Sequence, residues 1–567
     1  MARTPMFRQI RRLMSAALKA NRLHLTEADV HERLEEDRHN LIDRRRFLGG
    51  AAMAAAAAAS GAAMFGGQAK AASPSASSLL PATPVVIVGA GAAGMAAAYT
   101  LKKSRIPFIL YEGANRIGGR VFTQDRFNSD GQFVELGAEL VDSDHDALLG
   151  LAKEVLGPWG IQEFAEADGL EGDLFFFDGK LRSESEFIAG VRPLLAQIEA
   201  DRVAIYQGLD PAEAVISADW PGSDKVREID RLSVGEYLDR HGGLVDPWIR
   251  QALIVAYTGD MGTEVDRQSA INLVYAIDTG PDINGFHLFG GDESRRVRGG
   301  NSRLIEALYR KVFDGRDRNA TLYRGYNLQT LHQNSGGTRF TLTFDARGRT
   351  QEVAAHQVIL AIPATMLRQV AGLDALELDP LVKRQVSELG YGTNSKIMMS
   401  YDQRFWRQGH NGRPRTEGSL YLDLGSQNIW ETSRRQEGRQ GVLTNFLGGE
   451  AGLRANAETA AKAQSDLAAV YGDDALRTRA AKSVCWNWNT MPFVRASYSC
   501  PGPCQFTSFW GRMAKPQLDG RLIFAGEHTS TSDWGFMNGA YESGIRAAGQ
   551  VVESRRGRSM PAQRRAG

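Results

Sequence analysis

One stretch after residue 84 restricts the fold of this chain more than any other. "VVIVGAGAAGMAAAYTLKKSRIPFILYEG" reads as a short apolar strand, a glycine turn, an alanine-rich helix and a second strand that ends at Glu112. Gly89 allows the tight turn, Gly91 lets a pyrophosphate approach the backbone, and Gly94 lets the helix pack on the strand. Glu112 is placed to bind ribose hydroxyls. A structural glycine turn is the alternative, but the order of these parts predicts a dinucleotide site in an α/β domain.

Composition limits the kind of partner. The chain has 567 residues, of which 67 are basic and 66 acidic, so its net charge is +1. The length predicts two domains or one large interleaved unit. The balanced charge provides no general field that would attract nucleic acid or an anionic membrane. We therefore expect a small-molecule partner and no nucleic acid, and we assign no metal ligands.

Residues 1–71 are expected to be a leader that contains an export signal. "DRRRFLGGAAMAAAAAASGAAMFGGQAKAAS" places Arg44 and Arg45 ahead of a mildly apolar alanine and glycine run, which ends at a small-residue site near Ala71. This order is typical of a twin-arginine signal peptide, which exports folded proteins. The run is too poor in leucine to make a stable membrane span. We expect cleavage near Ala71 and a periplasmic or secreted protein; residues 1–40 have no readable role.

Two features of the C-terminal part leave alternatives open. Cys500 and Cys504 flank the turn "CPGPC", which is either an ordinary Pro-Gly turn with two thiols or a local disulfide in an exported chain. The last residues, 554–567, are basic and poor in apolar side chains. They are expected to form a disordered tail.

The blocks that follow the glycine motif indicate a flavin. Glu112 is followed by a second basic, glycine-rich turn in "GANRIGGRVFT", which suits a large flavin bound along its whole length better than a nicotinamide. Further blocks are "VELGAEL", "VRGGNSRLIEAL", "VILAIPATML", "SKIMMSYDQRFW" and a closing "FAGEHT" with "GFMNGAYESGIRAA". Together these blocks make the mature chain resemble the flavin-dependent amine oxidase superfamily, which includes monoamine, polyamine and L-amino-acid oxidases.

The resemblance implies an α/β fold in which a Rossmann-like FAD-binding domain is interleaved with an α+β substrate-binding domain. The FAD-binding pieces would be residues 82–143, 286–361 and 483–553, and the substrate-domain pieces 144–285 and 362–482. Alternation in "LYRGYNLQTLHQ" and "TRFTLTF" predicts a β-meander. The segments 147–285 and 374–482 show helical periodicity with charged faces.

By the same resemblance, both ends of the chain build the FAD site. The C-terminal helix would return to the first domain, with Glu527 near the ribityl or pyrophosphate group and Met537 near the flavin ring. Small residues would keep that approach open, namely Gly535, Gly539, Ala540 and Gly544; helix packing is the alternative. The other cofactor-binding residues that the resemblance implies are Gly119, Arg120, Gly137, Ala138 and Leu328. Of these, Leu328 would contact adenine through its backbone. Ser497 stands where some monoamine oxidases have a flavin-bonded cysteine, so FAD is expected to be non-covalent.

The chemistry is assigned to three residues. Lys396 lies in an apolar, β-rich stretch, where an unpaired lysine would be costly. The matching lysine of the family holds a water beside flavin N5, which implies a catalytic role; a lysine pointing out of an edge strand is the alternative. Tyr498 and Phe536 match two aromatic positions that face each other over the flavin. Such walls would orient a neutral amine and exclude water, although each aromatic could also be an ordinary core residue.

Two positions depart from particular branches of the family. Leu140 stands where the venom type of L-amino-acid oxidase has an arginine that clamps the substrate carboxylate. An amino-acid substrate would therefore need another clamp. Asp142 stands where polyamine oxidases have an acid near the substrate, and it could bind a distal ammonium group. It could equally cap the helix that begins in "DSDHDALLGLAKEVLG".

The sequence thus predicts an exported FAD-dependent amine oxidase of the monoamine or L-amino-acid type. An amine or amino acid, water and dioxygen would give an imine, then a carbonyl product, ammonia and hydrogen peroxide. The alternatives are a polyamine or cyclic-amine oxidase, a dehydrogenase that passes electrons to a carrier, and a flavin-binding protein without turnover. A homodimer is compatible with the sequence.

Overall fold

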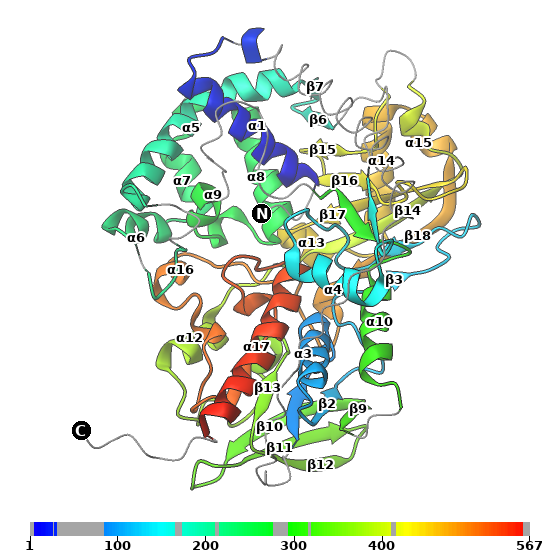
Figure 1. Cartoon of the computed structure of the whole chain (residues 1–567). Helices are drawn as coiled ribbons and strands as arrows, with labels where there is room; N and C mark the ends of the chain where they lie inside the picture. The colour runs from blue at the N-terminus through cyan, green and yellow to red at the C-terminus, as the bar shows by residue number, and fades with distance from the viewer. Residues whose placement is uncertain are drawn as a thin grey trace, which may run out of the picture.

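The computed structural model describes residues 5–26, 28–30, 84–164, 173–209, 215–220, 222–275, 293–315, 319–409 and 415–558. Within these ranges the chain passes repeatedly between a parallel α/β unit and a larger unit of mixed strands and helices, at the bottom and the top of Figure 1. The predicted twin-arginine signal and most of the predicted basic tail lie outside the described residues.

The α/β unit is built on a five-stranded parallel sheet. Its order is β19 (Leu522–Phe524), β13 (Val358–Leu360), β1 (Val85–Val88), β2 (Phe108–Glu112) and β9 (Ala320–Arg324). Every pairing in it is parallel. The strands come from widely separated parts of the chain, so the expected interleaved α/β fold with a Rossmann-like domain is confirmed.

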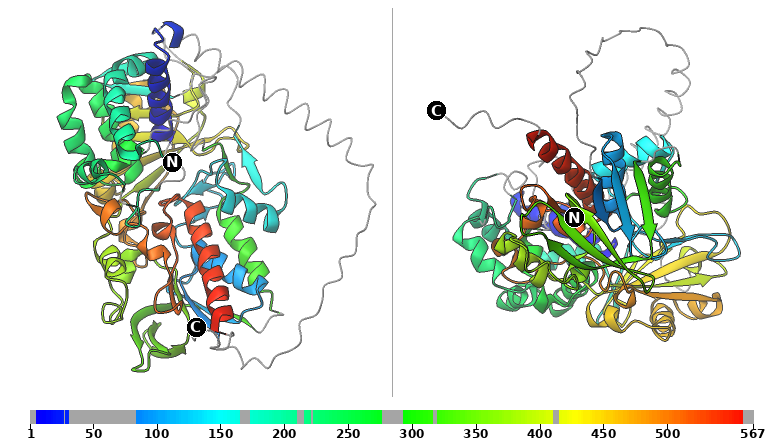
Figure 2. Two further views of the ribbon diagram at one scale, coloured as in Figure 1. Left: turned by 60° about the vertical axis from the view of Figure 1, so that its left-hand side comes forward. Right: turned by 90° about the horizontal axis from the view of Figure 1, so that it is seen from below.

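Alternate residues of β1 pack on opposite faces of the parallel sheet. Val85 and Ile87 pack towards three helices that lie side by side, namely α3 (Ala92–Lys103), α10 (Ser302–Val312) and α17 (Met537–Arg558) (Figures 1 and 2). Val86 and Val88 pack towards the predicted meander, which is confirmed as β10 (Tyr326–Gln333), β11 (Phe340–Ala346) and β12 (Thr350–Ala355). Burial on both faces explains why "VVIV" lacks polar alternation.

Helix α17 lies very close to α3. A Cβ atom at Gly544 would come within 2.1 Å of the Ala93 carbonyl oxygen. This glycine therefore serves helix packing, which was the alternative to an approach by the cofactor.

The larger unit contains a seven-stranded sheet. Its order is β18 (Arg479–Asn487), β14 (Ser395–Tyr401), β17 (Gly441–Leu447), β16 (Asn428–Glu431), β15 (Leu420–Leu422), β6 (Leu174–Phe177) and β7 (Lys180–Arg182). The helical periodicity expected for residues 374–482 is therefore wrong for much of that segment. Strands β14 and β17 are buried at every position and lack the alternation that identifies a half-exposed strand. The expected domain boundary at residue 483 falls inside β18.

Two groups of helices pack near this sheet. The first group shares one core in which α8 contacts β6 and β15; it consists of α5 (Glu184–Tyr206), α6 (Asp224–Asp230), α7 (Val234–Arg240), α8 (Pro247–Met261) and α9 (Ile271–Tyr275). In the second group, α13 (Gly449–Arg454) and α14 (Thr459–Tyr471) contact β14, and α15 (Asp474–Arg477) packs on α14. Helix α12 (Pro380–Glu388) packs instead in the core of the α/β unit. Helix α5 begins with a capping box, in which the side chain of Ser183 accepts from the backbone of Glu186 and the Glu186 side chain accepts from Ser183. Helix α1 (Pro5–Arg22), from the segment without a readable role, packs against α5 and α8.

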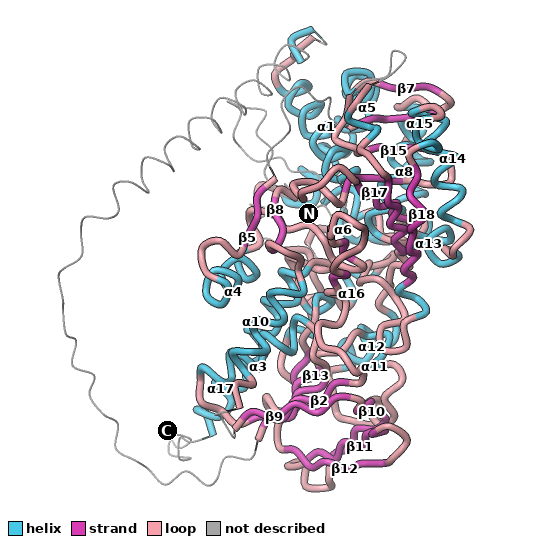
Figure 3. The backbone as a smooth tube through the Cα atoms, turned by 90° about the vertical axis from the view of Figure 1, so that its right-hand side faces the viewer, coloured by secondary structure: helices cyan, strands magenta, loops and turns pink. Residues whose placement is uncertain are grey.

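Shorter elements connect the units. They are β3 (Thr123–Gln124), β4 (Val134–Glu135), α4 (Asp146–Leu156), β5 (Ile161–Glu163), β8 (Arg295–Val297), α11 (Ala364–Leu367) and α16 (Gln505–Ser508). Figure 3 shows many loops, in pink, in the region between the two sheets, with α16 among them. None of the helices in the described ranges combines the length and hydrophobicity needed to cross a membrane.

Candidate active site

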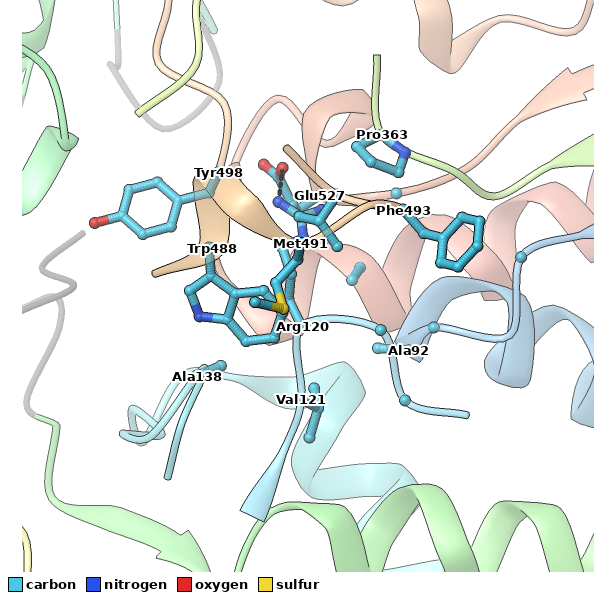
Figure 4. A pocket seen from close by; sticks show the side chains of 18 of the residues that line it. Ala92, Arg120, Val121, Ala138, Pro363, Trp488, Met491, Phe493, Tyr498 and Glu527 are labelled. Carbon is cyan, nitrogen blue, oxygen red and sulfur yellow. Dashed lines mark hydrogen bonds and ion pairs between the residues drawn. The ribbon is translucent and has the colours of Figure 1, made fainter. Parts of the chain in front are cut away.

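A cavity of about 590 Å³ runs between the two units. One end is formed by the glycine turn after β1 and by the end of β2, and the other by β14, β16, β17 and the loop before α16. Figure 4 shows Tyr498, Trp488 and Met491 on one side of the cavity and Phe493 and Pro363 on the other. The wall combines residues from four of the five expected pieces, and none of its described residues comes from 144–285.

The end near Glu112 fits a ribose and a pyrophosphate. The buried Glu112 carboxylate accepts hydrogen bonds of 2.7 Å from the backbone N–H groups of Ala90 and Ala114. Burial raises its pKa, and these bonds only partly oppose the rise. A Cβ at Gly91 would meet no atom closer than 3.9 Å, so space remains in front of the first turn of α3, which has no side-chain cap. An open helix N-terminus beside a buried acid suits a dinucleotide.

The other two glycines of the motif act within the protein. Gly89 has a φ of +101°, and a Cβ there would lie 2.5 Å from the Ala361 carbonyl oxygen. A Cβ at Gly94 would lie 1.8 Å from the Gly89 carbonyl oxygen. Gly94 therefore permits close contact between helix and strand, as the motif predicts, and it is absent from the cavity wall.

Glu527 joins the two ends of the chain. Its Oε1 lies 2.9 Å from a guanidinium nitrogen of Arg120, an ion pair that Figure 4 marks with a dashed line. Its Oε2 accepts hydrogen bonds of 2.7 Å from the Ser499 hydroxyl and the Gly535 N–H. Burial disfavours the ionised form, but Arg120, His528 and Ser499 more than offset this and lower the pKa. Glu527 thus holds the start of α17 against the Arg120 turn at the cavity wall.

His528 is a site residue that the sequence reasoning missed. Its ring is buried at the cavity wall, and in the described structure neither ring nitrogen has a hydrogen-bond partner. Burial lowers the pKa of His528 to about 4, and neighbouring arginines add to the shift. The ring is therefore neutral near pH 7 and offers one donor and one acceptor to a bound group. Its position directly after the expected cofactor residue Glu527 was the available signal.

Lys396 lies at the opposite end of the cavity, on a central strand. In β14 it is paired with Phe446 of β17 and Trp486 of β18, so the edge-strand alternative does not hold. The residue is only 4% exposed. Its Nζ lies 2.7 Å from Oε2 of Glu139 and 3.2 Å from the backbone oxygen of Glu135. These bonds leave one of the three ammonium protons for the cavity.

Glu139 is the partner that the sequence reasoning missed, although it lies in the quoted block "VELGAEL". Its Oε1 accepts from Nε1 of Trp430 at 3.2 Å and from the Thr432 hydroxyl. Burial opposes ionisation of Glu139, but Lys396 outweighs it with help from Thr432 and Trp430, so the pKa is lowered. With this many hydrogen bonds the Glu139 carboxylate stays ionised at neutral pH.

Aromatic rings surround the inner end of the cavity. The predicted Tyr498 and Phe536 both line it. The Tyr498 hydroxyl donates to the backbone oxygen of Asp260 at 2.5 Å, which directs this group away from a free role in acid–base chemistry. Sequence reasoning missed three further aromatic lining residues, Trp430, Phe446 and Trp488. Trp430 and Phe446 lie on strands with an ordinary core pattern, and Trp488 follows directly after β18, so only the fold identifies them.

Asp142 lies outside the cavity wall among the described residues. Its Oδ1 accepts from the Glu293 N–H at 2.6 Å, and its Oδ2 lies 3.3 Å from Nε2 of His145. His145, and not Asp142, occupies the N-cap of α4. With Asp144 these residues form a compact group of possible metal ligands. Of the three, Asp142 and His145 contact each other, and Asp142 also contacts the backbone of Glu293.

The structure brings the remaining predicted site residues to the same cavity. Those on its wall are Gly89, Gly91, Glu112, Gly119, Arg120, Gly137, Ala138, Leu328, Lys396, Tyr498, Glu527, Phe536 and Met537. Leu140 also lines it. Cys500 and Cys504 are free thiols, one buried and one exposed, so the turn "CPGPC" contains no disulfide.

Relatives and solved structures agree with this architecture. Lysine-specific histone demethylase 1 homolog 1 of Oryza sativa is 25% identical over 85% of this chain and 53% of its own length, and the L-amino-acid oxidase of Pseudechis australis is 24% identical over 82% and 86%. The chain spans little more than half the length of the two relatives that are named lysine-specific histone demethylase homologs. Cyclohexylamine oxidase from Brevibacterium oxydans has the same fold, with a TM-score of 0.67, 17% identity, and coverage of 84% of this chain and 100% of that chain.

The chain also matches the model of a whole protein family. The family model described as flavin containing amine oxidoreductase matches residues 92–552, a range that includes almost all of the cavity wall. The cavity fits a flavin dinucleotide at one end and has the buried lysine and aromatic walls at the other. The chain belongs to the flavin-containing amine oxidoreductase family.

Proposed function

We propose that this protein is an amine oxidase with non-covalently bound FAD. The reaction converts R₂CH–NH₂, water and dioxygen into R₂C=O, ammonia and hydrogen peroxide. The observation that supports this proposal is a single cavity that extends from Glu112, at the dinucleotide end, to the buried Lys396. Residues that bind a cofactor and residues that bind a substrate thus share one space.

FAD, when bound, supplies the capacity to accept a hydride from the α-carbon of the amine. Glu112 would hold its ribose, the first turn of α3 its pyrophosphate, and the Met537 region its ring. Ser497 has a hydroxyl that donates to Oδ1 of Asn394 at 2.6 Å and provides no thiol for a covalent bond. Acid precipitation should therefore release all of the yellow flavin into the supernatant; flavin in the pellet would contradict the non-covalent assignment.

The chain's own groups orient the amine and control water. Tyr498 and Phe536 provide apolar ring faces against which a neutral amine packs, and they exclude bulk water from the reacting carbon. The free ammonium proton of Lys396 is available to hold one water beside the reacting centre. A water held there would lie beside the reacting carbon, where it could hydrolyse the imine.

The charges at the cavity wall favour an amine without an α-carboxylate. Among the described lining residues, the cationic groups are already engaged: Arg120 by Glu527, Lys396 by Glu139, and Arg116 by backbone oxygens. Leu140 adds no charge. A substrate carboxylate would therefore lack a free cationic partner and would lie near Glu139. The similarity to cyclohexylamine oxidase supports the same class of substrate.

An L-amino-acid oxidase is the second candidate, because the Pseudechis australis enzyme of that name matches most of this chain. A peroxide-coupled screen separates the two. Purified protein is supplied with cyclic and aliphatic amines, diamines and L-amino acids at equal concentration. Peroxide from amines but not from amino acids supports the proposal, and the reverse result replaces it. Flavin bleaching without peroxide would indicate a dehydrogenase that uses a carrier, and no bleaching by any compound would contradict the enzyme assignment.

We further propose that the protein is exported in folded form. The support is the order of Arg44, Arg45, the alanine and glycine run and the small-residue site near Ala71. Export after folding suits a protein that must bind its cofactor in the cytoplasm.

A further inference from the structure

Helix α1 is built into the folded body although it precedes the predicted export signal. The large apolar side chains of α1, Met6, Ile10, Leu13, Met14 and Leu18, are at most 3% exposed. They share one core with residues of α5 and α8, among them Val191, Leu195, Leu253 and Tyr257. Figures 1 and 2 show α1 lying alongside α5. A leader that served only as a targeting signal would not need to bury an apolar helix face in the folded protein.

Polar contacts set the register of α1 on α5. Asn21 and Arg192 bond in both directions: Nε of Arg192 donates to Oδ1 of Asn21 at 2.7 Å, and Nδ2 of Asn21 donates to the Arg192 backbone oxygen at 3.0 Å. Arg192 also donates to the backbone oxygen of Leu25 at 3.0 Å. Gln9 bonds to Glu184 near the start of α5, and Arg22 pairs with Glu199 near its end. The two helices therefore run parallel with a defined register.

Helix α1 also reaches the support of the substrate cavity. The side chain of Arg11 is buried and acts electrostatically on Tyr257 of α8, as does Asp260. The backbone oxygen of Asp260, in the last turn of α8, accepts the hydrogen bond from the Tyr498 hydroxyl. Contacts thus lead from α1 through α8 to an aromatic wall of the cavity.

We propose that α1 is a permanent structural part of the enzyme, which stays bound to α5 and α8 when the chain is cut between residues 30 and 84. The proposal concerns the folded full-length chain and does not rest on the proposed export. The occupant of the α5–α8 surface is the chain's own N-terminal segment.

The test cuts the full-length, flavin-loaded protein at a specific protease site inserted after Ala72. Arg44→Lys and Arg45→Lys are included so that host processing does not interfere. After cutting, gel filtration and intact-mass measurement should find the N-terminal fragment and the body together in a 1:1 ratio. The flavin spectrum should be unchanged. A fragment that elutes alone, whether the body stays soluble or precipitates, would overturn the proposal.

Variants identify the surface. Leu13→Asp places a charge in the shared core, so the cut sample should release the fragment. Val203→Asp is the matched control, because Val203 lies on α5 but is 64% exposed, and it should retain the fragment. Arg192→Met keeps the aliphatic stem but removes the bonds to Asn21 and Leu25, so release on dilution should begin at a roughly tenfold higher concentration. If Leu13→Asp does not fold, Arg192→Met alone tests whether these contacts hold the fragment.

The readouts separate this proposal from the proposed activity. Retention of the fragment is measured without any substrate, so it can succeed or fail independently of the amine screen. Where an amine substrate is found, loss of α1 should raise KM with the flavin still bound, because α1 contacts α8 and is absent from the wall of the cofactor end. Retention unaffected by both Leu13→Asp and Arg192→Met would show that the assigned contacts do not hold α1.

Discussion

Nζ of Lys396 lies 2.7 Å from Oε2 of Glu139, and both side chains are almost completely buried. The lysine therefore acts as half of an ion pair, and not as an isolated charge in front of the cofactor. Its hydrogen bonds to Glu139 and to the backbone oxygen of Glu135 fix the position of the amine group at the cavity wall.

Replacing Lys396 should slow the chemistry without loss of the cofactor. Lys396→Met removes the group that holds the water, and such electrostatic contributions are worth about 3 kcal/mol, or roughly a hundredfold in rate. Stopped-flow measurement of flavin reduction by substrate and of reoxidation by dioxygen shows which step depends on it. Lys482→Met, at an exposed position on the neighbouring strand β18, is the control and should leave both rates unchanged. Wild-type rates in Lys396→Met would remove the catalytic assignment.

The same pair should be visible in stability. Glu139→Gln leaves the Lys396 charge buried without its partner, which should cost about 3 kcal/mol or more of unfolding free energy. The double variant Lys396→Met with Glu139→Gln should lose less than the sum of the two single changes, since neither charge is left alone. Denaturant unfolding of the four proteins measures this coupling. Strictly additive losses would mean that the two side chains do not interact.

Glu135 should make stability fall as pH rises. Burial raises its pKa to about 8, Glu139 adds to the rise, and the Asn301 N–H, Thr123 and Lys396 oppose it. The folded state therefore keeps a proton that the unfolded chain releases near pH 4.5. Its contribution is full below that pH and declines up to about pH 8, by at most about 1.4 kcal/mol per pH unit.

The variant Glu135→Gln should flatten this decline. The neutral amide resembles the protonated acid and has no proton to lose. Thermal unfolding between pH 5 and 8 compares it with wild type and with Glu437→Gln, an exposed acid that should change nothing. An undiminished pH dependence in Glu135→Gln would assign the effect to another group.

Gly91→Val should abolish flavin binding while the protein still folds. A Cβ at Gly91 has no protein atom within 3.9 Å, so the valine side chain would fill the space intended for the pyrophosphate. The absorbance ratio at the flavin and protein bands measures occupancy, and circular dichroism checks the fold. Gly150→Val is the control, since nothing lies within 4 Å of a Cβ on that exposed helical position. A yellow Gly91→Val protein would place the cofactor elsewhere.

The export signal is tested by Arg44→Lys with Arg45→Lys. Twin-arginine export requires both arginines, so folded, flavin-loaded precursor should accumulate in the cytoplasm. Arg46→Lys changes the neighbouring arginine outside the pair and should leave export intact. Cell fractionation followed by immunoblotting gives the answer, and unaltered periplasmic protein in the double variant would exclude this route.

The sequence by itself determined the dinucleotide unit. The glycine motif, the flanking strands and Glu112 are close in the chain, and each has a local steric or hydrogen-bonding reason that is readable from residue type. The meander was readable because its strands have one exposed and one buried face. Lys396, Tyr498 and Phe536 were found through a resemblance carried by separate sequence blocks, and the fold brings them to one cavity.

Only the tertiary structure decided which groups are partners. Glu139 and Lys396 are far apart in the chain and meet because β14 crosses the end of the "VELGAEL" segment. Asp142 accepts a hydrogen bond from the backbone N–H of Glu293, which lies 151 residues further along the chain. Strands β14 and β17 were hidden because full burial removes the alternation that marks a strand. The sequence assigned helix α1 to a leader. An apolar helix face predicts that the helix is buried, but it does not identify the surface that buries it. The fold shows that this surface is formed by α5 and α8.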